Sequence, residues 1–150
     1  MNKENFNEII DFAVAREKEA VKFYQDLQKI AKFQSIKKVL KDFEKMEEGH
    51  VKLLENIRTK GFEALQEKEI PNLKISEYMV EADFAENMNY QDILIVAMKR
   101  EEASKKLYED MAIRFSDPEI KKLFSRLAVE EAEHKLKFEK LYDEDILKEN

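Results

Sequence analysis

Six acidic and histidine side chains stand at sequence positions where helical periodicity calls for an apolar residue. Both histidines of the chain follow a glutamate by three positions, which makes two Glu-x-x-His motifs. Side chains at this spacing project from one face of a helix. Two more glutamates stand 30 positions before the glutamates of these motifs. The six residues are Glu17, Glu47, His50, Glu101, Glu131 and His134.

The chemistry that fits these six residues is the binding of two metal ions. Four ionised carboxylates in a protein core would each cost several kcal/mol unless their charges were offset. Two divalent cations would supply that offset. Carboxylate oxygens with one imidazole per metal suit iron or manganese, and they admit zinc or cobalt. We expect no catalytic residue beyond these metal ligands and no other cofactor-binding residue.

Four long stretches of the chain carry apolar residues at steps of three and four positions, which is the pattern of amphipathic helices. Alternating patterns typical of strands are absent, so we predict an all-α protein. The six polar residues lie on the apolar rows of these helices. The rows run from Phe6 to Ala31, from Ile36 to Ile57, from Leu94 to Phe115 and from Ile120 to Leu141.

Capping residues mark several of the helix ends. Asp117 before Pro118 predicts the start of the fourth helix, because an acidic N-cap followed by proline is typical of a helix start. Asn89 predicts the start of the third helix in the same way. Lys60 followed by Gly61 predicts the end of the second.

The two halves of the sequence repeat each other at an offset of 84 positions. This offset places Glu17 on Glu101, and it likewise superimposes the two Glu-x-x-His motifs. The chain is therefore interpreted as one helical hairpin used twice, over residues 5–60 and 89–146. Two such hairpins bury their apolar rows most simply as a four-helix bundle.

Within each hairpin, the two glutamates are expected at the same height. Glu17 and Glu47 have their midpoint at residue 32, and Glu101 and Glu131 have theirs at residue 116. Both midpoints fall close to the predicted turns, and residues equidistant from the turn of an antiparallel pair lie level. The four carboxylates are therefore expected in one layer of the bundle.

The connection between the hairpins, residues 61–88, is much longer than the usual link of about 2–8 residues between antiparallel helices. Such a link can run the length of the bundle, so we predict an up-down-down-up order with one long crossover. A short helix is expected within it, around Ser76–Asn87. No composition shift divides the chain, so residues 1–150 are predicted to form a single domain.

The composition excludes several classes of protein. The chain has 27 Lys and Arg residues against 33 Asp and Glu residues, and its net charge of −6 argues against binding to nucleic acid or anionic membranes. The absence of cysteine excludes disulfides, zinc-thiolate sites and iron–sulfur clusters. The polar N-terminus does not resemble a signal peptide, and no apolar run approaches the ~18 residues that span a bilayer. We expect a soluble, cytoplasmic protein.

The motifs of this chain resemble those of the rubrerythrin-like branch of the ferritin-like superfamily. Residues 17–24 are similar to the first-helix motif of that family, in which an aromatic residue follows a glutamate by seven positions. Residues 47–50 and 131–134 are similar to its two Glu-x-x-His motifs. The resemblance covers all four predicted helices, and it implies a ferritin-like four-helix bundle with a centre of two iron ions.

The resemblance also implies a role for each ligand and an activity. The expected activity is the reduction of hydrogen peroxide, with the oxidation of ferrous iron as a related reaction. The identity of the metals stays open, since manganese or zinc could take the place of iron. The implied roles are bridging carboxylates for Glu47 and Glu131, terminal carboxylates for Glu17 and Glu101, and terminal imidazoles for His50 and His134.

Two departures from the family affect the expected activity. Rubrerythrins often carry a rubredoxin-like domain whose iron is held by four cysteines, and these 150 residues contain no cysteine. Electrons are therefore expected from another protein, such as a rubredoxin-like one. Rubrerythrins also tend to have a further glutamate one turn after the position of Glu101, where this chain has Ser104.

The small substrate would be peroxide or oxygen, and a homodimer is expected.

Several alternatives stay open at this point. The protein could be a ferroxidase or other iron-handling protein, or a metal-stabilised helical bundle without enzymatic activity. Tyr24 and Tyr108 could be core aromatics or participants in redox chemistry, and Gly49 could allow close helix approach or be neutral. Five glutamates beside the apolar rows are expected to face water: Glu19, Glu48, Glu102, Glu130 and Glu133.

Overall fold

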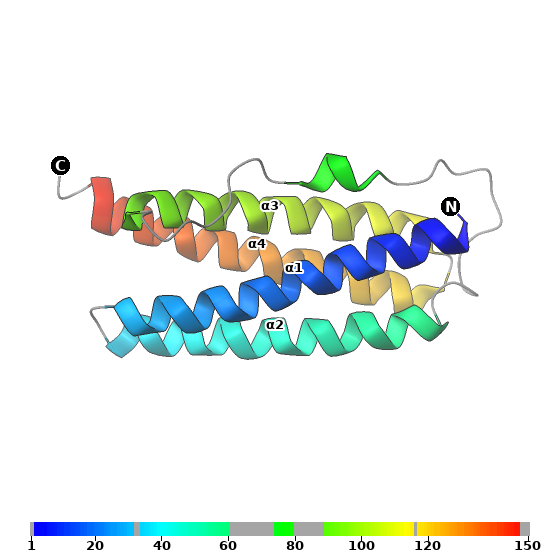
Figure 1. The fold of residues 1–150 in the computed structure, drawn as a ribbon, viewed down its shortest axis with the longest axis horizontal. Coiled ribbons are helices and arrows are strands. Elements are labelled where there is room, and N and C mark those ends of the chain that lie inside the picture. Colours follow the sequence, from blue (N-terminus) through cyan, green and yellow to red (C-terminus); the bar gives the residue numbers. More distant parts are fainter. Residues whose placement is uncertain (1, 32–33, 61–73, 80–88, 116, 148–150) are drawn as a thin grey trace. The chain divides into compact units, whose positions relative to one another are not determined.

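The computed structural model describes residues 2–31, 34–60, 74–79, 89–115 and 117–147, and helices account for almost all of them (Figure 1). Within these ranges the structure contains no β-strand, which confirms the all-α prediction. The long helices are α1 (Lys3–Ile30), α2 (Gln34–Lys60), α3 (Tyr90–Arg114) and α4 (Pro118–Tyr142). Two short helical segments are η2 (Ile75–Tyr78) and η3 (Asp143–Leu147).

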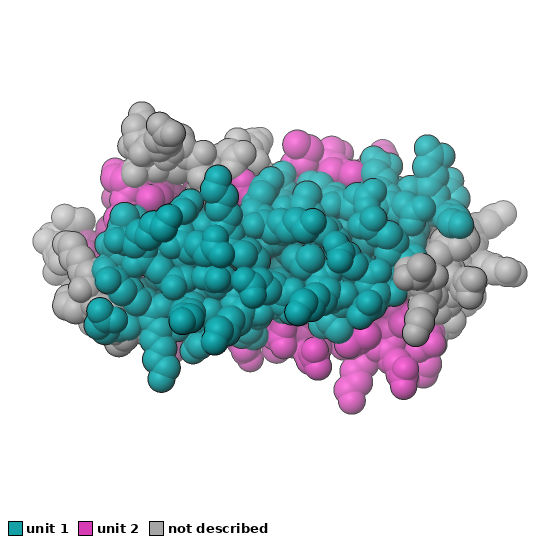
Figure 2. Space-filling view, turned by 60° about the horizontal axis from the view of Figure 1, so that its bottom comes forward, with its two compact units in different colours: residues 1–73 teal, residues 74–150 magenta. Residues whose placement is uncertain are grey.

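The chain divides into two compact units, which Figure 2 shows in different colours. The N-terminal unit, Met1–Leu73, contains the hairpin of α1 and α2, and the C-terminal unit, Lys74–Asn150, contains the hairpin of α3 and α4. In each unit the two long helices lie side by side (Figure 1). Helices α1 and α2 lie within residues 3–60 and helices α3 and α4 within residues 90–142, while the single domain over residues 1–150 with hairpins 5–60 and 89–146 stays a prediction. The up-down-down-up order stays a prediction, and residues 61–73 and 80–88 of the crossover lie outside the described residues.

Apolar side chains at helical spacing hold the N-terminal hairpin together. The side chain of Asn2 caps α1 by accepting a hydrogen bond of 2.7 Å from the backbone nitrogen of Asn5. Along α1 the buried side chains recur at steps of three and four from Phe6 onward. Tyr24 of α1 meets Phe43 of α2 edge to face, with ring centroids 5.8 Å apart. These two rings pack α1 against α2.

The C-terminal hairpin begins and turns at the predicted capping residues. The side chain of Asn89 accepts a hydrogen bond from the backbone nitrogen of Asp92 at 2.8 Å, which confirms the start of α3. Asp117 caps α4 through the backbone nitrogen of Glu119 at 2.8 Å, with Pro118 in the first turn, which confirms the start of α4. Helix α2 is described as far as Lys60, and the predicted stop at Gly61 lies outside the described residues.

The short segment η2 is anchored on α3 by one tyrosine. The hydroxyl of the buried Tyr78 donates a hydrogen bond of 2.7 Å to Oδ2 of Asp110, and the amine of Lys106 lies 5.6 Å from the centre of the ring. The helix predicted around residues 76–87 thus begins near its expected place. The described segment is a short 3-10 helix that is followed by extended backbone at Met79, so the rest of the predicted helix is not tested. Residues 80–88 are not among those described.

Candidate metal centre

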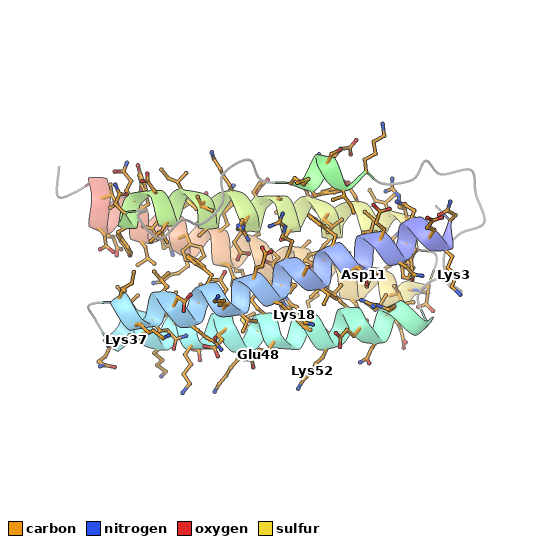
Figure 3. All side chains as sticks on the ribbon, in the orientation of Figure 1. Lys3, Asp11, Lys18, Lys37, Glu48 and Lys52 are labelled. Atoms are coloured by element: carbon orange, nitrogen blue, oxygen red, sulfur yellow. The ribbon has the colours of Figure 1, made fainter. Side chains whose placement is uncertain are left out.

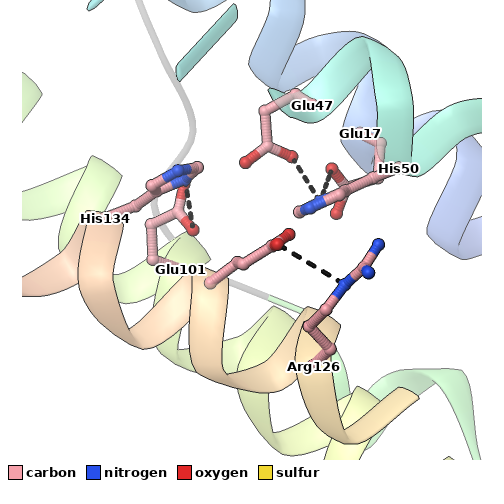
Figure 4. A network of polar contacts seen from close by, with 7 residues as sticks. Glu17, Glu47, His50, Glu101, Arg126 and His134 are labelled. Atoms are coloured by element: carbon pink, nitrogen blue, oxygen red, sulfur yellow. Dashed lines mark hydrogen bonds and ion pairs between the residues drawn. The ribbon is translucent and has the colours of Figure 1, made fainter. Parts of the chain in front are cut away.

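The N-terminal hairpin brings together the three ligand candidates of the first half of the sequence. Nδ1 of His50 lies 3.3 Å from Oε2 of Glu17 on α1 and 3.4 Å from Oε2 of Glu47, one turn earlier on α2. All three side chains are buried. Figure 4 shows the carboxylates of Glu17 and Glu47 pointing toward the imidazole of His50. One potential ligand atom from each residue lies within 4.8 Å of those of the other two.

The C-terminal hairpin repeats this arrangement with the candidates of the second half. Nδ1 of His134 on α4 lies 3.8 Å from Oε2 of Glu101 on α3 (Figure 4). Glu131 stands one turn before His134, and one potential ligand atom from each of the three residues again lies within 4.8 Å of the others. These side chains are at most 5% exposed. Each hairpin therefore contains one buried group of two glutamates and one histidine.

The geometry of each group follows from the positions of its residues in the hairpin. The i, i+3 spacing of Glu47 and His50 puts both side chains on one face of α2, and Glu17 reaches them from the buried face of α1. The separation of 30 positions between Glu17 and Glu47 makes them nearly equidistant from the turn between Ile30 and Gln34. The same separation of 30 positions lies between Glu101 of α3 and Glu131 of α4. The level arrangement of the carboxylates within a hairpin was thus accessible from the sequence.

The donors of each group suit a divalent metal ion. Carboxylate oxygen and imidazole nitrogen are ligands that iron, manganese and zinc accept in proteins. Two ionised carboxylates carry a charge of about −2, which one divalent ion offsets. Within the described part of the chain, no further acidic or histidine residue belongs to a cluster of this kind. The two groups therefore have the composition of two metal-binding sets with identical donors.

Glutamates next to the two groups behave differently from the candidate ligands. Four of the five expected in water are exposed, whereas Glu130 is half-buried and lies 3.6 Å from Arg126. Glu102 accepts a hydrogen bond of 3.0 Å from Lys135, and this bond lowers the pKa of Glu102. Glu102 and Glu130 thus form ion pairs with a lysine and an arginine, whereas Glu101 and Glu131, one position away, belong to the buried groups.

Two further side chains singled out by the sequence are part of the core. Tyr24 and Tyr108 are each 1% exposed and pack against Phe43 and Phe124, respectively, as core aromatics do.

Gly49 stands beside His50 on α2, and a Cβ atom built on it would meet no atom within 4 Å. Within the described part of the N-terminal hairpin, close approach of α1 is therefore not the reason for this glycine.

Comparison with known proteins agrees with the resemblance of the motifs. The family model Rubrerythrin matches residues 8–142. Neither the curated proteins nor the solved structures searched contain a significant match. No helix in the described ranges has the length and apolar character needed to cross a membrane. The family match, the four long helices and the buried Glu–Glu–His groups fit a di-iron protein of the ferritin-like fold class. This chain belongs to the rubrerythrin family.

Proposed function

We propose that the protein is a di-iron oxidoreductase that reduces hydrogen peroxide with electrons from a separate protein. The observation that carries this proposal is the pair of buried Glu–Glu–His groups, one in each hairpin of a rubrerythrin-family chain. In this proposal the two groups together form one centre. Six residues would hold the two metals, Glu47 and Glu131 as the shared carboxylates, Glu17 and Glu101 as terminal carboxylates, and His50 and His134 as terminal imidazoles.

The balance of charge supports one centre with two ions. Four buried carboxylates close together would raise one another's proton affinity, and two divalent ions remove that penalty. The imidazoles of His50 and His134 add neutral donors without further charge. The aromatic side chains of Tyr24 and Tyr108 are buried in the same hairpins and help to exclude water from the core. These residues would hold a redox-active centre away from bulk solvent.

The chemistry that two bound ferrous ions supply is the transfer of the two electrons that hydrogen peroxide needs to become two molecules of water, with two protons taken up. The residues of the protein would bind the two ions and hold the ligand side chains in a fixed orientation. The i, i+3 spacing on α2 and α4 fixes each histidine relative to its glutamate. Each carboxylate has two oxygens that can accept a metal, so Glu47 and Glu131 would offer the centre more than one donor atom.

The two electrons consumed in each reaction must be replaced from outside these 150 residues. These residues contain no cysteine, and hence no iron held by cysteines that could act as the electron donor. We therefore propose an electron-carrying partner of the rubredoxin type. Ser104 stands one turn after Glu101. In this proposal its small side chain would leave room near the centre for a small substrate such as peroxide.

The proposal is tested by loading the protein with ferrous iron without oxygen and titrating it with hydrogen peroxide. We expect two irons per chain, and oxidation of both by one equivalent of peroxide. Glu47→Ala should lose both irons, because this residue is proposed to bridge them. Glu48→Ala is the matched control, since Glu48 is exposed and adjacent in sequence. A Glu47→Ala protein that keeps two irons and full reactivity would refute the bridging role.

The same titration separates the two alternatives. A ferroxidase would oxidise many ferrous ions per chain with oxygen, because iron is then the substrate and leaves the centre. A purely structural metal site would bind two metals without reacting with peroxide. Either result would replace peroxide reduction as the function, while leaving the six ligands in place.

A further inference from the structure

The exposed face of helix α2 carries a row of charged side chains in which lysine predominates. The side chains of the row recur at successive steps of three, four, three and four positions, so they lie along one line of the helix. The row consists of Lys38, Lys41, Lys45, Glu48 and Lys52, which are all exposed, and we call it the lysine row. Figure 3 shows Glu48 and Lys52 on the side of α2 away from α1.

Within the described part of the chain, the lysines of this row form no ion pair with a carboxylate. Lysines on the C-terminal hairpin differ in this respect. The amine of Lys135 on α4 lies 3.0 Å from Glu102, and that of Lys105 on α3 lies 3.5 Å from Glu109. The positive charges of the lysine row are therefore available to a partner molecule.

The charge of the lysine row is opposite to that of the whole chain. Four lysines and one glutamate give the row a net charge of +3, whereas the chain carries −6. Most of the surface therefore repels an acidic protein, and the field of the row favours its approach from this side. Charge complementarity of this kind raises the rate of association and fixes the orientation of the partners.

The internal repeat shows that the hairpin does not itself require lysines at this face. At the offset of 84 positions, the lysine row corresponds to residues of α4 of which only the first is charged. These residues are Lys122, Ser125, Val129, Ala132 and Leu136. The two hairpins share their metal-ligand candidates but differ on their outer faces, so the positive face belongs to α2 alone.

The lysine row stands on the outside of the helix that carries one of the two Glu-x-x-His motifs. Lys45 and Lys52 flank Glu47 and His50 in the sequence. Glu47 is 1% exposed and His50 is 2% exposed, so both lie on the buried face of α2. A helix with its side chains is about 10–12 Å across. A protein bound to the lysine row is therefore separated from these ligand candidates by the thickness of one helix.

We infer that the lysine row is the docking surface for the electron-carrying protein, and that this partner presents an acidic face. The inference rests on the proposed function, which requires a donor that comes from outside the chain. A protein fits better than a nucleic acid, because the exposed carboxylates of Asp42, Glu48 and Glu55 stand in or beside the row and would repel a continuous line of phosphates. An acidic protein can place single carboxylates opposite the lysines.

The inference is tested with the variant Lys41→Glu/Lys45→Glu and with reduced, acidic rubredoxin as the probe. Absorbance follows the reoxidation of rubredoxin by the iron-loaded protein in the presence of peroxide. At low ionic strength the second-order rate constant should fall by about tenfold or more, because the reversed charges repel the probe. The difference should shrink with added salt, since the screening length falls from about 30 Å at 0.01 M to about 3 Å at 1 M.

The matched control is Lys122→Glu/Lys140→Glu, which makes the same change of charge at exposed positions of α4. Its rate constant should stay close to that of the natural protein. An equal fall in both variants would show that net charge matters and the lysine row does not, which would overturn the inference.

Two further measurements separate docking from the chemistry of the metal centre. Calorimetric titration of the protein as purified with oxidised rubredoxin reports docking alone, and the affinity should fall about tenfold in the Lys41→Glu/Lys45→Glu variant. Peroxide titration without rubredoxin reports the centre alone, so a failure there counts against the proposed function while the calorimetry still decides on docking.

Cross-linking of the natural protein avoids dependence on the folding of any variant. A carbodiimide joins lysine amines to carboxylates, and mass spectrometry should find rubredoxin linked to Lys41 or Lys45. Absence of binding, cross-links confined to lysines outside the row, or tighter binding of a short DNA duplex than of rubredoxin would overturn the inference.

Discussion

A buried polar side chain needs a partner that reduces the cost of its burial. Tyr78 is an example outside the metal groups, since it is 2% exposed and its hydroxyl donates to Asp110 at 2.7 Å. Burial and, next, the hydrogen bond to Asp110 raise the pKa of Tyr78. Burial and the hydrogen bond to Asp145 raise the pKa of Tyr90 in the same way. Both phenols therefore keep their protons in the folded protein at a pH where an unfolded chain loses them.

The raised pKa of Tyr78 predicts a loss of stability at alkaline pH. An unfolded tyrosine ionises near pH 10, so below that pH both states are protonated and the contribution of Tyr78 is fully present. Above it, the unfolded chain releases the proton first, and the free energy of unfolding falls as pH rises toward the folded pKa. Tyr78→Phe should lower the free energy of unfolding at pH 7 by about 1–2 kcal/mol. It should also flatten the decline above pH 10.

Urea unfolding at a series of pH values measures both effects. Tyr142→Phe is the control, because it removes a hydroxyl that accepts an exposed hydrogen bond from Gln91. If Tyr78→Phe has the stability and the alkaline decline of the natural protein, the contact with Asp110 does not anchor η2.

At the scale of elements, the long helices and their starts were predictable because their determinants are local. Asp117 with Pro118 defines the start of α4 within three residues of sequence, and the apolar rows repeat every turn. The anchoring of η2 was not predictable, because Tyr78 and Asp110 stand 32 positions apart and neither belongs to a periodic pattern. A single polar contact between distant positions leaves no trace in sequence spacing.

The candidate ligands were predictable for the same reason that the helices were. A glutamate or histidine on an apolar row, such as Glu47 or His134, breaks a regular pattern and therefore stands out. Helix α4 also carries a second, exposed apolar row that includes Val129 and Leu136. This row was not predicted, because the helix already had one complete apolar row. Comparison of the two repeats, position by position, would have revealed it.

Gly49 offers a prediction about α2 itself. A glycine inside a helix costs about 1 kcal/mol relative to alanine, and a Cβ atom at this position would meet nothing within 4 Å. Gly49→Ala should therefore raise the free energy of unfolding by roughly 0.5–1 kcal/mol, measured by urea denaturation. Iron content should not change, because the methyl group does not replace a ligand. A destabilised variant would show that α2 needs the glycine for a reason other than space.

At the scale of the whole molecule, bound metal is expected to contribute to stability. Each hairpin holds two carboxylates that approach each other within 4.8 Å, so removing the metals leaves like charges close together in both. A chelator should lower the melting temperature by about 5–10 °C, because ligands present at a hundred times their dissociation constant stabilise by about 2.7 kcal/mol.

Calorimetry or circular dichroism with and without the chelator measures this shift. The metal-free Glu47→Ala protein is the control, and its melting temperature should not respond to the chelator. An equal shift in both proteins would mean that the chelator acts elsewhere, and no shift in either would mean that the metals do not stabilise the fold.

The repetition of one hairpin has a consequence for how the centre would fill. Both groups offer two carboxylates and one imidazole at the same spacing, so neither position has a better set of donors than the other. A protein given only half the metal it can hold would then divide it without preference between the two positions. Titration with a spectroscopically distinct ion such as cobalt would give a mixture of empty, singly filled and doubly filled chains instead of one ordered intermediate.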